Sequence, residues 1–237
     1  MNLDILAIAA HPDDIEIICG GTMIKLADRG KKTGIVDLTA GEMGTLGSAE
    51  VRLRESQEAG KIMGLSAREN LHLPDSGLEI TQENKLKIAA AIRKYRPQLV
   101  ILPVPENQRH PDHRAASILG HDACFLAGLR KIGLDGEPHR PRKIIYAASF
   151  DDGATSFSID ITDQFERKLQ AVAAYTSQFD GSEQSRQIFR PGNDIFELMQ
   201  VYGRRHGMAA GCRFAETFRV KGPILLDDPF NIIPRTA

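Results

Sequence analysis

Residues Leu3–Asp14 read LDILAIAAHPDD, a short apolar run followed at once by polar residues. An apolar run such as Leu3–Ala10 is typical of a strand that is buried on both faces of a parallel sheet. The next segment, Ile15–Arg29, has the pattern of a helix, and Thr33–Thr39 is again strand-like. This opening strand–helix–strand unit therefore predicts an α/β fold.

The same alternation continues through the first half of the chain. Helices are predicted over Glu50–Met63 and Thr81–Tyr95, and strands over Asn70–Leu73 and Leu99–Leu102. Alternating strands and helices form a mostly parallel sheet with right-handed crossovers. Ligands of such sheets bind beyond the carboxyl ends of the strands. We therefore expect the loops after the first, second and fourth strands to share one edge.

The second half is less regular, and it predicts a smaller α+β portion. A polar, glycine-containing segment, Phe179–Asn193, is predicted to be a mobile loop. The remaining expected elements are helices over Asp112–Leu129, Asp163–Gln178 and Asp194–His206, and strands over Lys143–Ser149, Phe157–Ile161 and Phe214–Val220. A length of 237 residues fits one domain better than two.

Composition excludes several classes of protein. The formal net charge is −1, so neither nucleic acid nor an anionic membrane surface is an expected partner. No apolar run has the length of a transmembrane helix, and the N-terminus lacks the basic start of a signal peptide. The three cysteines are far apart and form no C-x-x-C pair, which argues against a disulfide framework. We expect a cytoplasmic protein.

The first polar cluster is AHPDD, at the end of the first strand. His11 and Asp14 flank a turn fixed by Pro12, so both side chains can point at one spot, with Asp13 beside them. Imidazole and carboxylate groups are suitable ligands for zinc or another divalent first-row metal. In the alternative interpretation, Pro12 starts the helix and the aspartates stabilise its positive end.

The second cluster, RHPDH, follows the fourth strand and also opens a helix. His110 and His113 can face the same side of that helix, although two solvated histidines would have the same spacing. Two His-Pro-Asp clusters at equivalent places of one sheet are an improbable coincidence. A shared metal site is therefore the favoured interpretation, and spacing alone does not say which of the two histidines is the ligand.

The sequence resembles the LmbE-like, or PIG-L, family of zinc deacetylases. That family carries an AHPDD-type motif near the N-terminus and an HPDH-type motif about a hundred residues later. GEMGTLGS with the following Arg52, and NLHLPDSGL, are similar to two further loops of the family. RPQLVILPVPENQRHPDH, YTSQF and AETF resemble the branch that deacetylates N-acetylglucosaminyl malate for bacillithiol synthesis.

The resemblance implies a Rossmann-like core over residues 1–130, with residues 131–237 as an extension that completes the pocket of a single domain. It implies one zinc ion per chain, held by His11, Asp14 and His113. Iron or cobalt could occupy the same ligands. Asp13 would be the general base.

The resemblance also implies roles for four side chains near the metal. His110 would stabilise the oxyanion, and Asp112 would orient the His110 ring. Arg52 and Arg109 would contact the substrate, where they favour an anionic aglycone such as malate. A homo-oligomer such as a hexamer is expected on the same ground.

The predicted reaction is hydrolysis of the N-acetyl group of N-acetylglucosaminyl malate. The alternative substrates are N-acetylglucosaminyl inositol, N-acetylglucosamine and chitooligosaccharides. A hypothesis of another class is a non-catalytic module that binds a sugar or a nucleotide on the same scaffold. In each case the partner is a small molecule.

Overall fold

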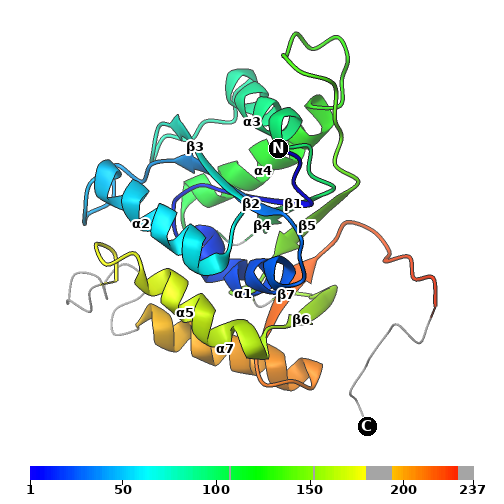
Figure 1. The fold of residues 1–237 in the computed structure, drawn as a ribbon. Helices are drawn as coiled ribbons and strands as arrows, with labels where there is room; N and C mark the ends of the chain where they lie inside the picture. The colour runs from blue at the N-terminus through cyan, green and yellow to red at the C-terminus, as the bar shows by residue number, and fades with distance from the viewer. Residues whose placement is uncertain (107, 152, 180–193, 229–237) are drawn as a thin grey trace.

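The computed structural model describes residues 1–106, 108–151, 153–179 and 194–228 (Figure 1). Its centre is a seven-stranded sheet in the order β3-β2-β1-β4-β5-β7-β6. The strands are β1 (Ile5–Ala9), β2 (Thr33–Thr39), β3 (Ala67–Leu73), β4 (Leu99–Pro103), β5 (Lys143–Ala147), β6 (Phe157–Asp160) and β7 (Ala215–Arg219). In the described ranges the helices are α1 (Asp14–Asp28), α2 (Ala49–Met63), α3 (Gln82–Tyr95), α4 (Pro111–Leu126), α5 (Phe165–Ala173), α7 (Ile195–Ala210) and the short 3-10 helix η1 (Thr162–Gln164).

The sheet is parallel from β3 to β5, and β7 pairs antiparallel with both β5 and β6. This arrangement confirms the predicted α/β fold with a mostly parallel sheet. β1 lies between β2 and β4, and its register places Ile5 opposite both Thr33 and Leu99. The loops after β1 and β4 are therefore neighbours.

Two helical layers cover the two faces of the sheet. Leu6 and Ile8 of β1 belong to the apolar cluster that also contains residues of α3 and α4. Ala7 and Ala9 point the other way, into the cluster formed with α1, α2 and α5. This alternation along β1 explains why the strand is apolar throughout, because both of its faces are buried.

Helix α1 is broken at Cys19, which has non-helical backbone angles (φ −150°, ψ 21°). The buried carboxylate of Glu216, on β7, accepts hydrogen bonds from the backbone N–H groups of Gly21 (2.9 Å) and Thr22 (2.7 Å). Lys168 of α5 donates to the same carboxylate at 2.5 Å. The C-terminal strands are thus fixed to the helix that follows the first polar cluster.

Some predicted boundaries were wrong. β3 begins at Ala67, not Asn70. The first residues of β3 are charged, so the sequence did not indicate a strand there. The structure accommodates the charge because the guanidinium of Arg68 is buried against Asp37 (2.8 Å) and Glu16 (2.5 Å). The helix expected over Asp163–Gln178 is replaced by η1, α5 and a turn. Nearly all of the loop expected over Phe179–Asn193 lies outside the described residues, which resume at 194. None of the described helices is long and apolar enough to cross a bilayer.

Candidate metal centre

The two His-Pro-Asp clusters meet at the carboxyl ends of β1 and β4. Helix α1 begins at Asp14 and helix α4 at Pro111, and the two helices pack on opposite faces of the sheet. A crevice opens where the crossovers diverge. A cavity of about 500 Å³ lies there, and seven of the eight predicted site residues line it: His11, Asp13, Asp14, Arg52, Arg109, His110 and His113.

Three predicted ligands converge within this cavity. His113 Nε2 lies 3.3 Å from His11 Nδ1 and 3.1 Å from an oxygen of Asp14. The other oxygen of Asp14 is 3.5 Å from His11 Nδ1. One ligand atom from each residue lies within 4.8 Å of the others, a spacing that lets all three reach a single ion. Two nitrogens and one oxygen are a donor set that suits zinc and leaves a coordination position open.

The electrostatics around His11 also fit a cation. Burial lowers the pKa of His11, but the carboxylates of Asp112, Asp14 and Asp75 raise it more strongly, to about 12. Negative charge is thus concentrated around one imidazole, and a divalent ion would neutralise it. A second possible set shares His11 and adds His110 and Asp112. That set fits less well, because both carboxylate oxygens of Asp112 accept hydrogen bonds from backbone N–H groups, whereas at Asp14 the backbone N–H of His11 reaches one oxygen only.

Asp75 contacts the far side of His11 and is not among the residues predicted from the sequence. Asp75 Oδ1 lies 3.0 Å from His11 Nε2, and Asp75 Oδ2 accepts a hydrogen bond from the backbone N–H of Met43 at 2.8 Å. A carboxylate behind a ligating histidine fixes the orientation of the ring and raises its basicity. The one indication in the sequence was its place, since Asp75 is an acidic residue in the loop that follows the third parallel strand.

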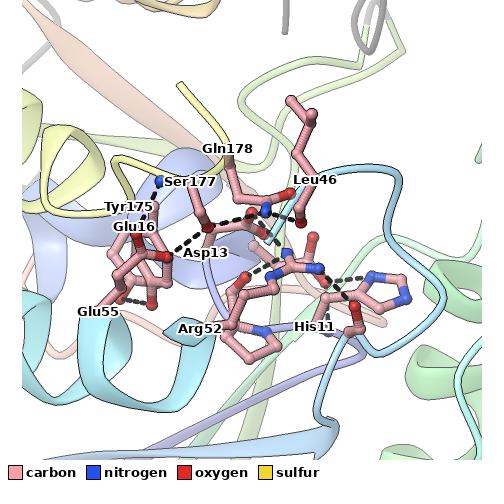
Figure 2. Close-up of polar contacts among 12 residues, drawn as sticks. His11, Asp13, Glu16, Leu46, Arg52, Glu55, Tyr175, Ser177 and Gln178 are labelled. Carbon is pink, nitrogen blue, oxygen red and sulfur yellow. Dashed lines mark hydrogen bonds and ion pairs between the residues drawn. The ribbon is translucent and has the colours of Figure 1, made fainter. Parts of the chain in front are cut away.

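Asp13 lines the cavity, and Figure 2 shows the contact that Arg52 makes with it. Arg52 Nη2 donates to the carboxylate at 2.9 Å. Burial raises the pKa of Asp13 to about 7, and the charge of Arg52 opposes that rise. The backbone of Asp13 is left-handed (φ 106°, ψ −28°), a conformation that costs a non-glycine residue free energy and is often found at functional sites.

Arg52 is buried, and its hydrogen bonds go to the protein. Besides Asp13, its guanidinium donates to the carbonyl oxygens of Gly41 and Pro12, both at 3.0 Å. Helix α2 carries Arg52 on its inner face, below the glycine-rich loop. In this structure Arg52 is therefore a partner of Asp13 as well as a residue of the cavity wall.

His110 is the N-cap of α4, and its ring centroid lies 4.8 Å from that of His11. Its Nδ1 accepts a hydrogen bond from the backbone N–H of Asp112 at 3.2 Å. Burial, followed by the charges of His11 and His113, lowers the pKa of His110. A neutral ring whose Nδ1 accepts carries its proton on Nε2, where it can donate to a ligand.

Asp112 lies behind the cavity wall. Its carboxylate accepts hydrogen bonds from the backbone N–H groups of Ser76 (2.7 Å) and Leu78 (3.3 Å) and lies 3.6 Å from His11 Nε2. Its contact with His110 runs through its backbone amide. Asp112 therefore fixes the loop that carries Asp75, beside the predicted ligand His11.

Comparison with known proteins agrees with this geometry. The family model of PIG-L, described as GlcNAc-PI de-N-acetylase, matches residues 6–124, which contain both His-Pro-Asp clusters. The chain belongs to the PIG-L family. This membership confirms the resemblance seen in the sequence, and the matched residues include all three converging side chains, His11, Asp14 and His113.

Other PIG-L relatives match well beyond residue 124. Diacetylchitobiose deacetylase of Thermococcus kodakarensis is 34% identical over 248 residues, covering 95% of this chain and 86% of that protein. A probable N-acetyl-alpha-D-glucosaminyl L-malate deacetylase 2 of Bacillus cereus is 28% identical, covering 75% and 84%. The crystal structure of the conserved protein TT1542 from Thermus thermophilus superposes with a TM-score of 0.85 and 40% identity, covering 96% of this chain and 98% of that one.

Proposed function

We propose that this chain hydrolyses the N-acetyl group of an N-acetylglucosamine derivative, with a divalent metal ion held by His11, Asp14 and His113. The observation that carries the proposal is the convergence of these three side chains beside the buried pair of Asp13 and Arg52, in one cavity of a PIG-L chain. Zinc suits the donor set, and iron or cobalt would suit it as well.

The surrounding residues have the groups that amide hydrolysis needs. When bound, a divalent ion supplies an acidified water molecule and polarises the amide carbonyl. Asp13 accepts a proton at its carboxylate from the attacking water and passes it to the leaving amine nitrogen. The Nε2–H of His110 donates to the oxygen that becomes negative in the transition state, and one such donor is worth about 3 kcal/mol. Arg52 keeps Asp13 oriented and favours its ionised form.

We favour a chitooligosaccharide such as N,N'-diacetylchitobiose as the substrate. The diacetylchitobiose deacetylase matches more of this chain, at higher identity, than the malate deacetylase does. The structure also removes part of the case for malate, because the charge of Arg52 is already neutralised by Asp13. Malate stays a second candidate, since Arg109 lines the cavity and could bind its carboxylates.

Acetate release tests the proposal directly. The purified chain is incubated with diacetylchitobiose, N-acetylglucosaminyl malate, N-acetylglucosaminyl inositol and N-acetylglucosamine, each with added zinc and with a chelator. We expect acetate only with metal, most rapidly from diacetylchitobiose, and almost none from Asp13→Ala. The exposed Asp135→Ala is the matched control.

Failure to release acetate from all four compounds, with zinc, iron and cobalt each supplied, would contradict the proposal. It would leave the non-catalytic sugar-binding module as the remaining hypothesis, and such a module need hold no metal. The cytoplasmic location and the homo-oligomeric state stay predictions from the sequence.

A further inference from the structure

The glycine-rich segment 41–48, here called the rim loop, forms part of the cavity wall through Met43, Gly44 and Thr45. Two residues of the active site hold its first half. Arg52 donates to the carbonyl oxygen of Gly41, and Asp75 accepts from the N–H of Met43. These two anchors leave the second half of the rim loop to be held by something else.

That second half is held by the turn after α5, residues 175–178, here called the clamp turn. Gln178 Nε2 donates to the carbonyl oxygen of Leu46 at 2.6 Å and to Ser177 Oγ at 3.0 Å (Figure 2). Gln178 is only 4% exposed and lines the cavity. The approach is close, because a Cβ added at Gly47 would lie 2.7 Å from Ser177 Oγ.

A buried carboxylate fixes the clamp turn itself. Glu55, on α2, accepts hydrogen bonds from Thr176 Oγ1 (3.0 Å), from the N–H of Ser177 (2.7 Å) and from Ser177 Oγ (2.7 Å). Glu55 follows Arg52 by three residues, so the two side chains lie on the same face of one helix. The helix that orients Asp13 therefore also anchors the clamp turn.

The clamp turn is attached to α1 as well. The hydroxyl of the fully buried Tyr175 donates to Glu16 at 2.8 Å. Glu16 is fully buried two residues after Asp14, and Figure 2 shows it beside Tyr175. Attachments to α1, α2 and the rim loop give the clamp turn a fixed place beside the cavity.

We propose that the clamp turn is a positioning element for substrate binding, in which Glu55 anchors the turn and Gln178 holds the rim loop over the cavity. The hydrogen bonds described for the clamp turn go to Glu16, Glu55 and the rim loop, and not to the three converging side chains. Loss of the clamp turn would therefore loosen the part of the wall that contacts substrate in the ground state and the transition state alike. Such a loss raises KM and leaves kcat nearly unchanged. The kinetic part of this inference rests on the proposed function.

Gln178→Met tests the inference, because methionine keeps the length of the side chain and removes its donor. Hydrogen–deuterium exchange of peptides covering 42–47 should become faster, while exchange in α4 and the metal content stay unchanged. KM for diacetylchitobiose should rise about tenfold, with kcat within about twofold of the wild type. Gln200→Met, at an exposed position of α7, is the matched control.

A second pair of variants separates anchoring from general damage to the fold. In Glu55→Gln the remaining oxygen can still accept two hydrogen bonds, and Ser177 Oγ can turn to accept from the new amide. Exchange and KM should stay close to wild type. Glu55→Leu removes every acceptor and should reproduce the effect of Gln178→Met.

Two results would overturn the inference: unchanged exchange at 42–47 in Gln178→Met, or a fall in kcat with KM unaffected. If exchange at 42–47 becomes faster in Gln178→Met but the wild type releases no acetate, the hold of the clamp turn on the rim loop is supported and the proposed function fails. The exchange measurement thus distinguishes the two failures.

Discussion

Asp13 is the residue on which the proposed chemistry depends most. Its carboxylate is buried against Arg52, and its backbone is held in a left-handed conformation at the start of α1. Each feature has a measurable consequence, one for the pH dependence of the reaction and one for the stability of the protein.

Arg52→Met removes the positive charge that lowers the pKa of Asp13. That pKa then rises, so at a given mildly acidic pH more of the carboxyl is protonated and unable to accept a proton. We expect the acidic limb of kcat/KM to move to higher pH by about one unit. A pH profile of the metal-loaded enzyme measures the shift. Arg54→Met, exposed on the same helix, should leave the profile unchanged.

Asp13→Gly should be more stable than Asp13→Ala by about 1 kcal/mol. Both variants lose the carboxylate and leave Arg52 without that partner, so they differ chiefly in backbone strain at φ 106°. Urea unfolding of the two metal-free proteins measures the difference. Equal stabilities would mean that the strain relieved by glycine is no larger than the unfolded-state entropy that glycine adds, which would contradict this prediction.

The two His-Pro-Asp clusters of the site could be predicted from the sequence, and the contacts made by residues distant in the sequence could not. Each His-Pro-Asp cluster sits between a strand and a helix, so its location follows from its own neighbourhood. Asp75 and Gln178 reach the site from loops whose paths depend on the packing of the whole sheet. The start of β3 could not be predicted for the same reason. The charge of Arg68 is neutralised by Glu16 and Asp37, which are distant in the sequence.

At the scale of elements, Glu216 accepts hydrogen bonds from the two backbone N–H groups that follow the break in α1. Glu216→Leu would leave Lys168 buried without its carboxylate and two backbone N–H groups without their acceptor. We expect a loss of about 3–5 kcal/mol in the free energy of unfolding. Urea denaturation measures it. The double variant with Lys168→Met should recover part of the loss, and a double variant less stable than the single one would contradict this account.

At the scale of the molecule, metal binding should stabilise the fold, because its ligands come from two separate loops. At a hundred times its Kd, an ion that binds only the folded state adds about 2.7 kcal/mol. For a chain of this size we expect zinc to raise Tm by roughly 5–10 °C. Thermal unfolding with zinc and with chelator measures the difference. His11→Ala should abolish the rise, and His72→Asn, at an exposed position, should keep it.

The two helical layers bury separate apolar clusters, one with α3 and α4 and the other with α1, α2 and α5. Asp14 starts a helix of one layer and His113 belongs to the other, so an ion between them would join two cores that the sheet keeps apart. Partial opening of either layer would lengthen the 3.1 Å contact between these side chains and release the ion. During gentle heating, a chain with native circular dichroism would then already have lost its metal and its activity.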